Sequence, residues 1–225
     1  MIAVTEPESR ATTPRVEWPI SELSTGDGYA TMTTCLIPRP IAWVSTLSGA
    51  GVDNVAPHSF NTVAGIDPLT VCFVSIGVKD TLTNVRDTGE FVLCIGSEHQ
   101  SALINDSATA LDDATSEFDA AVIPREPSTA VRPPRIAGAP IALECRVSGE
   151  HATGDSYMVF GEVLLIAVDE RVLAADGRPD PRLVAPVARL GRNQWCRMGD
   201  VFTLDRIAAD DWHAGRRTEP PGFTG

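Results

Sequence analysis

Short runs of apolar and β-branched residues, separated by turn residues at close spacing, are the feature that most restricts how this chain can fold. Their length and their content of valine, isoleucine and aromatic residues predict β-strands. The clearest runs are Ile41–Thr46, Thr70–Ile76, Phe91–Ile95, Ala139–Ser148 and Tyr157–Val168. Long helical patterns do not alternate with them, which argues against a doubly wound parallel sheet. The sequence therefore predicts a mainly β fold of barrel type with a few flanking helices.

Turn signals and changes of period predict the elements between these strands. Gly89 would end a short helix over Lys79–Thr88, and a second helix is expected over Gln100–Ala114. The other predicted segments are a hairpin turn at Leu47–Asp53, a strand over Asn54–Ala64 interrupted by Pro57, a turn at Asp67-Pro68, an irregular insert at 115–138, a loop at Gly149–Ser156, a polar excursion at Arg171–Pro186 and a last segment at Val201–Leu204.

Length and composition suit a globular domain with a sizeable core. The chain has 225 residues, of which 43% are hydrophobic and 21% are charged. Regular patterning stops short of both ends. We expect a flexible N-terminal arm over residues 1–20, one domain over residues 21–208 and a C-terminal tail over residues 209–225.

The charge balance restricts the classes of partner. A formal net charge of −12 argues against nucleic-acid binding, which needs a basic face, and against docking on anionic lipid. The N-terminal residues contain no apolar stretch typical of a signal peptide, and no apolar run has the length of a membrane span. We therefore expect a cytoplasmic protein without a nucleic-acid or membrane partner.

The cysteines predict free thiols. The chain has five, an odd number, and no two of them form a CxxC pair. Cys72, Cys94 and Cys145 lie within apolar strand-like runs, where buried free thiols in a reducing compartment are the expectation. The spacing predicts neither a disulfide framework nor a metal site.

Two polar clusters flank the first predicted hairpin. Two prolines bracket Arg39 just before the first strand and would hold this cation in place, near a bound anion or simply on a surface turn. The stretch Asn54–Asn61 crowds amide, imidazole and hydroxyl groups between apolar neighbours. Because Pro57 removes a ladder donor, this strand is expected to bend and could present amides beside Ser59 and Asn61 to a polar heterocycle or a phosphate.

A third polar cluster lies where a strand runs into a helix, at Ser75–Asn84. Gly77 and Lys79 precede the predicted helix start, and Thr81 lies in its first turn. The first amides of a helix and its positive dipole end favour a phosphate. A capped helix with one solvated lysine would leave the same pattern, so this cluster alone decides nothing.

Taken in order, these segments resemble the flavin reductase-like family, which has the FMN-binding split-barrel fold, a Greek-key-like barrel. The resemblance covers about Tyr29 to Leu204. The residues that carry it are PRPIAWVST (Pro38–Thr46), NVAPHSFN (Asn54–Asn61), Asp67-Pro68, Ser75–Ile95, Ile136–Cys145, Val159–Leu164 and VARLGRNQW (Val187–Trp195). The last block usually continues to a tyrosine, and here Trp195 stands at or near that place.

The resemblance implies a set of residues that hold flavin mononucleotide, with FAD as the alternative. Ser59, Lys79 and Thr81 would hold the phosphate, with Arg39 near it, and the strand Asn54–Asn61 would line the ring and the ribityl chain. The full set of implied cofactor-binding residues is Arg39, Ser45, Thr46, Asn54, Ala56, His58, Ser59, Asn61, Ser75, Gly77, Lys79, Thr81, Asn84 and Trp195. His151, in the predicted loop, is the one residue considered for a catalytic role.

The resemblance also implies a redox function. The expected activity is transfer of hydride from NADH or NADPH to the flavin, with reduced flavin supplied onward, for example to a monooxygenase. Two alternatives stay open: an enzyme that keeps its FMN and acts on a specific organic substrate, and a non-catalytic flavin-binding electron carrier. The family implies a homodimer with the flavin near the subunit interface.

Overall fold

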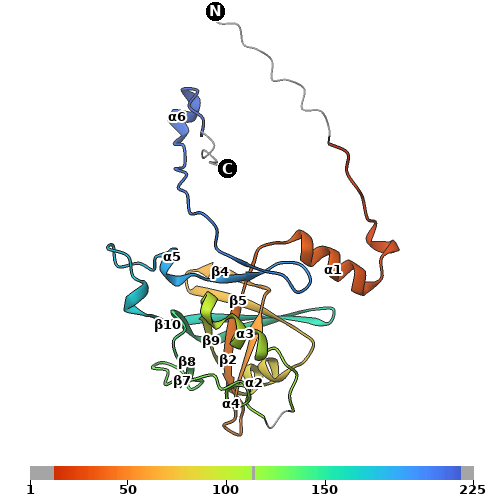
Figure 1. Cartoon of the computed structure of the whole chain (residues 1–225), viewed down its shortest axis with the longest axis vertical. Helices are drawn as coiled ribbons and strands as arrows, with labels where there is room; N and C mark the ends of the chain where they lie inside the picture. The colour runs from red at the N-terminus through yellow and green to blue at the C-terminus, as the bar shows by residue number, and fades with distance from the viewer. Residues whose placement is uncertain (1–12, 113–114, 219–225) are drawn as a thin grey trace, which may run out of the picture.

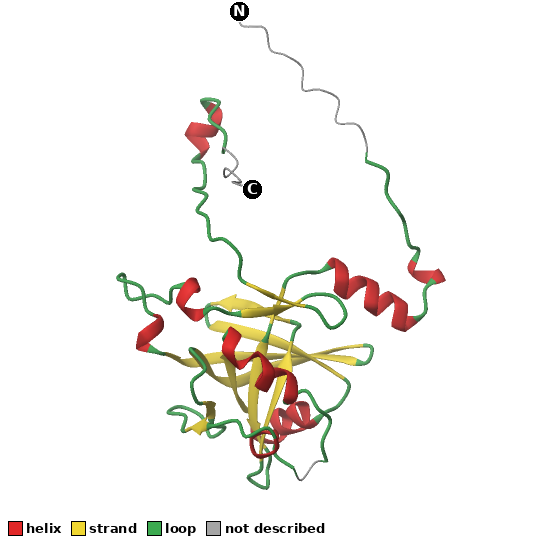
Figure 2. Ribbon diagram, in the orientation of Figure 1, coloured by secondary structure: helices red, strands yellow, loops and turns green. Residues whose placement is uncertain are grey.

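A single antiparallel sheet of seven strands forms the body of the protein (Figures 1 and 2). The computed structural model describes residues 13–112 and 115–218. The strand order in the sheet is β3-β2-β6-β9-β10-β5-β4. The strands are β2 (Ala42–Leu47), β3 (Asp53–His58), β4 (Asn61–Ile66), β5 (Leu69–Ile76), β6 (Glu90–Ile95), β9 (Ile141–Thr153) and β10 (Ser156–Val168). This arrangement confirms the predicted mainly β split barrel.

The two edges of this sheet, β3 and β4, follow each other directly in the chain. Ser59 and Phe60 join them, so the barrel closes through the covalent chain and not through a full ladder of hydrogen bonds. Val74 of β5 completes the closure: its amide donates to the Phe60 carbonyl at 2.8 Å, and its carbonyl lies 3.1 Å from His58 Nδ1. We call this junction, residues 58–61 with Val74, the seam.

The central strands are buried on both faces, which explains why they read as continuous apolar runs. In β2, Trp43 belongs to one core cluster and Val44 to the other. In β6, Val92 and Leu93 divide in the same way. Cys72, Cys94 and Cys145 are buried free thiols, as predicted. Period-2 alternation thus places both faces of β2 and β6 in apolar surroundings.

The chain also has short helices, some of them on the outgoing segments near the termini, and two small sheets. The helical elements are η1 (Ile20–Glu22), α1 (Thr25–Cys35), α2 (Asp80–Thr88), η2 (Glu98–Gln100), α3 (Ser101–Asp106), α4 (Glu117–Ala120), η3 (Glu170–Val172), α5 (Pro181–Val184) and α6 (Ala209–His213). The small sheets are β1-β11-β12 and β7-β8, built from β1 (Arg39–Pro40), β11 (Val187–Arg189), β12 (Trp195–Arg197), β7 (Arg125–Glu126) and β8 (Arg135–Ile136). The α2 residues Leu82 and Val85 pack into the barrel core.

The insert at 115–138 is irregular, as predicted, but it is part of the core. Phe118 and Ile136 are almost fully buried against the outer face of β2 and β6. Glu144 of β9 fastens the insert: its buried carboxylate accepts hydrogen bonds from the amides of Thr129 and Ala130 and pairs with Arg135 at 2.5 Å. Burial by itself would raise the pKa of Glu144, but these donors hold the pKa below its usual value.

Three expectations about local structure are wrong. Pro57 does not break a strand, because it lies within β3 opposite Trp43, and the chain turns two residues later at Ser59–Phe60. The expected loop Gly149–Ser156 is the end of the long β9–β10 hairpin, whose exposed polar arms show no apolar alternation. The helix expected over Gln100–Ala114 ends at Asp106, and residues 113–114 lie outside the described residues.

The chain segments next to both termini leave the barrel on the same side (Figure 1). They are residues 13–24, which lead into α1, and the stretch from β12 to α6. The segment expected at Val201–Leu204 has no regular structure. Of the predicted arm and tail, residues 1–12 and 219–225 lie outside the described residues, and the domain boundaries stay a prediction.

A glycine in β10 tests the packing of the barrel interior. A Cβ at Gly161 would lie 2.3 Å from Phe91 Cζ, and Phe91 is fully buried, so its ring has little room to move. Gly161→Ala should therefore lower the free energy of unfolding by about 1–3 kcal/mol, measured by urea denaturation. Gly149→Ala is the matched control, because a Cβ there meets nothing within 4 Å. Equal stabilities of the two variants would contradict this packing.

Candidate functional site

Two adjoining cavities lie at the seam. The first, of about 440 Å³, is the seam cavity, and it extends from the seam to the start of α2. The second, of about 350 Å³, is the arginine cavity, which lies between α1, the seam and the β11–β12 turn. They share the lining residues Tyr29, Pro57, Ser59 and Ala108. We call the two adjoining cavities together the trough, and each has a size that binds small molecules.

Lys79 marks the α2 end of the seam cavity. It is the only lysine in the chain, it is exposed, and it forms no ion pair with the described residues. It directly precedes α2, so the residue lies next to the amides of the first helical turn, which have no partner within the helix. Ser75 Oγ donates to the Gly77 carbonyl at 2.9 Å, and Gly77 adopts a positive φ of 75° that favours glycine. This turn therefore offers a cation and helix amides to an anion.

A buried polar network forms the floor of the seam cavity. Asn54 Oδ1 accepts hydrogen bonds from Thr81 Oγ1 at 3.1 Å and from Thr46 Oγ1 at 3.3 Å. Asn84 Nδ2 donates to Thr46 Oγ1 at 3.0 Å. Because all these side chains are buried and bonded to one another, the network fixes β2, β3 and α2 relative to each other.

Glu117 extends this network from the insert. Its Oε2 accepts from Asn54 Nδ2 at 2.8 Å and from the Val55 amide at 3.2 Å, and the residue lines the seam cavity. Burial is the largest influence on the Glu117 carboxyl and raises its pKa, and the nearby charge of Asp80 acts in the same direction. The insert thus contributes a buried carboxyl group to the floor of the cavity.

His58 lies at the seam itself. Its ring packs against Phe73 at 4.7 Å between centroids, and Nδ1 faces the Val74 carbonyl, so Nδ1 carries the proton. Nε2 is buried and has no hydrogen-bond partner within the described part of the chain. Burial lowers the pKa of His58 to about 4, with the charge of Lys79 adding to the effect. The imidazole is therefore neutral at pH 7 and holds the seam closed.

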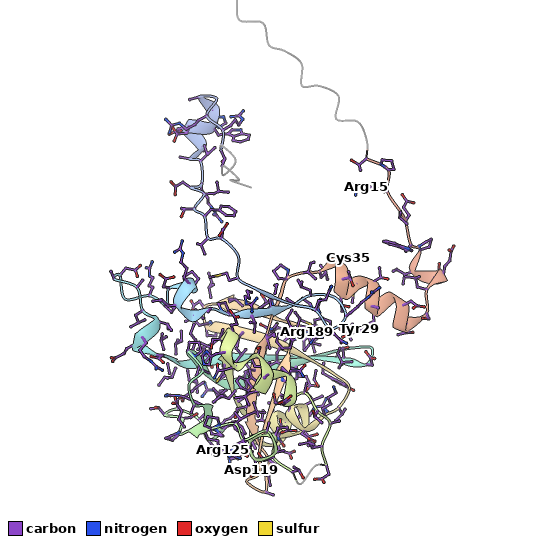
Figure 3. All side chains as sticks on the ribbon, viewed as in Figure 1. Arg15, Tyr29, Cys35, Asp119, Arg125 and Arg189 are labelled. Atoms are coloured by element: carbon purple, nitrogen blue, oxygen red, sulfur yellow. The ribbon has the colours of Figure 1, made fainter. Side chains whose placement is uncertain are left out.

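The arginine cavity has cationic and aromatic walls. Arg39 donates from its guanidinium to the carbonyls of Thr33, Leu36 and Leu190. Arg189 lies over the Trp195 ring at 5.0 Å from the centroid. Figure 3 shows Arg189 beside Tyr29 of α1, and both line this cavity. The cavity thus combines positive charge with flat apolar surfaces.

The structure brings half of the predicted cofactor-binding residues to one cavity. Those that line the seam cavity are Asn54, Ala56, His58, Ser59, Ser75, Lys79 and Thr81. Those that line the arginine cavity are Arg39, Trp195 and again Ser59. Those that line neither are Ser45, Thr46, Asn61, Gly77 and Asn84.

Most of the predicted residues that line neither cavity form hydrogen bonds that hold the surrounding elements in place. Thr46 and Asn84 belong to the buried network, and Asn61 Nδ2 donates to the carbonyls of Pro40 and His58, which braces the seam. Ser45 is fully buried, and its hydroxyl has no partner within the described residues. His151 is exposed in β9, opposite Met158, and lines neither cavity. Arg39 lines the arginine cavity, whereas Lys79 lines the seam cavity.

Sequence reasoning missed three kinds of lining residue. Tyr29 comes from α1, whose two glycines and scattered apolar residues give no helical signal. Glu117 comes from the irregular insert, where no pattern indicates burial. Arg189 and Arg192 belong to a block that was noted only for its aromatic residue. Only the folded chain brings these distant segments to the seam.

Known proteins are similar to this chain in sequence and in overall fold. Residues 32–182 match the flavin reductase like domain. The chain belongs to the flavin reductase-like family. An uncharacterized protein of Halalkalibacterium halodurans is 34% identical over 196 residues, which cover 82% of this chain and 93% of that protein.

Two solved structures show the same architecture. The 2-nitrobenzoate 2-nitroreductase of Pseudomonas fluorescens is 30% identical with a TM-score of 0.80, covering 86% of this chain and 98% of that one. Component B of nitrilotriacetate monooxygenase from Bacillus cereus is 28% identical with a TM-score of 0.80, covering 86% of this chain and 100% of that one. Family membership supports a flavin cofactor. No helix in residues 13–112 and 115–218 is long and apolar enough to cross a membrane.

The residues of the trough match the chemistry of a flavin nucleotide. An unpaired ammonium and helix amides suit a phosphate at the Lys79 end. The orphaned His58 Nε2 marks a polar position on the wall, and Tyr29, which lines both cavities, suits a flat ring towards the aromatic end. The trough is therefore polar at one end and aromatic at the other.

The buried histidine predicts a loss of stability in acid. The pKa of His58 is about 4 in the folded protein and 6.5 in the unfolded chain, so folding favours the neutral imidazole. This contribution to stability is complete above pH 6.5 and is lost as the pH falls through 4. The loss amounts to about 3 kcal/mol. His58→Asn, which keeps a donor for the Val74 carbonyl, should flatten this pH dependence in urea titrations of the apoprotein. The exposed control His151→Gln should retain it, and an unchanged slope in His58→Asn would contradict the assignment.

Proposed function

We propose that this protein is an NAD(P)H-dependent flavin reductase that binds FMN in the trough at the seam. The observation that carries the proposal is the seam cavity, whose one end holds the sole lysine of the chain, unpaired, at the start of a helix. Family membership supports the flavin, and the aromatic end of the trough supports a stacked nicotinamide. The phosphate lies at Lys79 and the ring lies towards Tyr29.

In this proposal the side chains place and hold the reactants. A bound flavin supplies hydride and electron transfer, and the protein supplies position and electrostatic surroundings. Lys79 and the first α2 amides bind the phosphate, and Thr81 is held in place by Asn54. The network beneath the cavity keeps this geometry fixed before the cofactor binds, which lowers the ordering cost of binding. The mechanism requires no nucleophile or metal ion from the chain.

The direct test mixes the purified protein with FMN and either NADH or NADPH and follows the nicotinamide absorbance. FMN-dependent oxidation of one dinucleotide supports the reductase, and its rate with each dinucleotide decides the co-substrate. Oxidation that does not depend on FMN, or no oxidation at all, contradicts the proposal. We place the reaction in the cytoplasm, since the five cysteines are free thiols and free thiols suit a reducing compartment.

A second candidate is an enzyme that keeps its FMN and reduces an organic substrate itself. The arginine cavity favours it, because that cavity adjoins the seam cavity and has room for a small molecule. The likeness to a 2-nitrobenzoate 2-nitroreductase points the same way. FMN that co-purifies, together with slow turnover of NAD(P)H until an organic acceptor is added, would favour this candidate over a flavin supplier.

The likeness to a monooxygenase component supports the supplier role. In that role the reduced flavin leaves the protein and reaches a separate oxygenase, so FMN must bind reversibly. An electron carrier would instead hold FMN that a chemical reductant reduces but neither nicotinamide does. The same absorbance experiment therefore separates all three functions.

Lys79 provides the sharpest test of where the phosphate lies. Lys79→Ala should weaken FMN binding by about 1.5–3 kcal/mol, roughly 10-fold to 150-fold in Kd, because a charge-assisted hydrogen bond is lost. Titration of apoprotein with FMN by fluorescence quenching measures this change. Arg178→Ala removes an equally unpaired cation outside both cavities and should leave the Kd unchanged. Equal affinities of the two variants would show that the phosphate lies elsewhere.

Exposed apolar side chains support a homodimer with the flavin near its interface. They belong to β4, β5 and β10 and to the segments that leave the barrel in Figure 1. The residues concerned are Val16, Trp18, Ile20, Val63, Ile66, Leu69, Leu164, Ile166, Val201, Phe202 and Leu204. Apolar surface of this extent marks an interface, and a second copy of the chain is the partner that family membership supports. The nearby Tyr29 would then lie close to the partner subunit.

One charged substitution tests the dimer. Ile66 of β4 is 84% exposed, and Ile66→Asp should shift the protein from dimer to monomer, because it places a carboxylate in the proposed apolar interface. Size-exclusion chromatography with light scattering measures the mass. Val122→Asp is the matched control, since Val122 is 81% exposed on the insert, away from the sheet face. A wild-type monomer, or a dimer that both variants retain, would contradict this interface.

A further inference from the structure

We propose that the arginine cavity is an anion site that holds the carboxylate or phosphate group of the molecule that reacts at the flavin. Its cations are Arg39, Arg189 and Arg192. This inference rests on the proposed function in one respect, namely that the flavin occupies the adjoining seam cavity. It goes further by assigning a charge and a shape to the second reactant.

The lining of this cavity is positively charged, whereas the chain as a whole has a negative net charge. The protein carries 30 acidic and 18 basic residues, yet none of the described residues that line this cavity is an aspartate or a glutamate. Its three arginines form no ion pair with the described residues. Most other arginines do pair with carboxylates: Arg86, Arg125, Arg132, Arg135, Arg146, Arg171, Arg197 and Arg216.

A larger hollow elsewhere has a different charge balance. It measures about 950 Å³ and lies between η2, η3 and β12. Its arginines are paired: Arg171 contacts Asp169 at 2.5 Å, and Arg197 contacts Glu98. Both carboxylates line the same hollow, so its charge is compensated internally. The arginine cavity has no such compensation and would gain it from an anionic ligand.

The cations of the arginine cavity are held in place before any ligand binds. The carbonyls of Thr33 and Leu190 fix the guanidinium of Arg39, while its Nε is buried without a hydrogen-bond partner in the described chain. Arg189 stacks on the Trp195 ring and donates from Nη2 to the Arg192 carbonyl at 2.7 Å. Fixed, stacked guanidinium groups suit bidentate binding of a planar anion.

The turn that carries Arg192 is fixed by close packing on α1. A Cβ at Gly191 would lie 2.3 Å from Thr34 Oγ1, so only glycine permits this approach. Arg192 itself has a positive φ of 58°. The β11–β12 turn is thereby pressed against the helix that provides Tyr29, and the two segments form opposite walls of the cavity. The site is therefore built by the fold and is not a chance cluster on a loop.

The remaining walls define the rest of the ligand. Tyr29 and Trp195 are aromatic, and Ile41 and Ile104 add aliphatic surface. A volume of about 350 Å³ accommodates one aromatic ring with its substituents. The shared residues Pro57 and Ser59 join this cavity to the seam cavity. The geometry thus points to a flat molecule with one anionic group, held beside the flavin ring.

Two sources provide this chemistry: an organic carboxylate that acts as the electron acceptor, and the diphosphate of the nicotinamide dinucleotide. Benzoate and ADP-ribose serve as probes of the two. Benzamide is the neutral control for benzoate, because it keeps the ring and loses the charge. Isothermal titration calorimetry of the FMN-loaded protein measures each affinity, and the visible flavin spectrum reports whether the ligand lies beside the ring.

The expected result is that at least one anionic probe binds and that binding depends on the cavity arginines. Arg189→Gln and Arg192→Gln should each lower the affinity for that probe by about tenfold or more, because a charge-assisted hydrogen bond is lost. Arg178 is an unpaired arginine outside the cavity, so the variant Arg178→Gln should bind the anionic probe as tightly as the wild type does. FMN affinity should stay the same in all three variants. Using two cavity variants keeps the test valid if one of them misfolds.

The set of probes that bind identifies which molecule supplies the anionic group. Benzoate binding at least about tenfold tighter than benzamide assigns an organic carboxylate, and arginine-dependent binding of ADP-ribose alone assigns the dinucleotide. The proposal is overturned if neither anion binds, or if both cavity variants bind the anion as well as Arg178→Gln does. If FMN itself does not bind, the proposed function fails, and calorimetry on the protein as purified still decides whether the arginines bind an anion.

Discussion

The closure of the barrel at Ser59–Phe60 is the constraint on which the other features depend. The edge strands β3 and β4 are neighbours in the chain and do not pair with each other, and the main chain of Val74 contacts both His58 and Phe60 at their junction. Space remains on both sides of this junction, and the two cavities occupy it. A fully hydrogen-bonded barrel would have no such trough in its wall. The site is thus a consequence of how the sheet closes.

The irregular insert connects stability to the site. Glu144 fastens one part of it through a buried pair with Arg135, and Phe118 anchors another part in the core. Between these anchors, Glu117 reaches the floor of the seam cavity and holds Asn54. The insert therefore has two physical tasks: it covers apolar strands that would otherwise face water, and it orients a polar side chain in the trough.

The sequence predicted those parts of the molecule in which local pattern and tertiary burial agree. Strands β2, β5 and β6 were predicted because they are largely buried and so read as apolar runs, and α2 was predicted because Gly89 ends it. The end of the β9–β10 hairpin was missed because its exposed arms are polar. Lining residues such as Tyr29 and Glu117 could not be predicted, since their positions depend on contacts between distant segments. The ordered polar clusters were recognised as one site because family resemblance supplied the long-range information.

The presence of a single lysine has a consequence beyond the phosphate contact proposed for it. Seventeen arginines provide the other basic side chains, and none of them is a primary amine. Reagents that acylate side-chain amines therefore have a single such target, at the start of α2 beside the seam cavity. The protein can be attached to a support or a fluorophore through its side-chain amine at a defined place in every molecule, and that place lies at the mouth of its own binding trough.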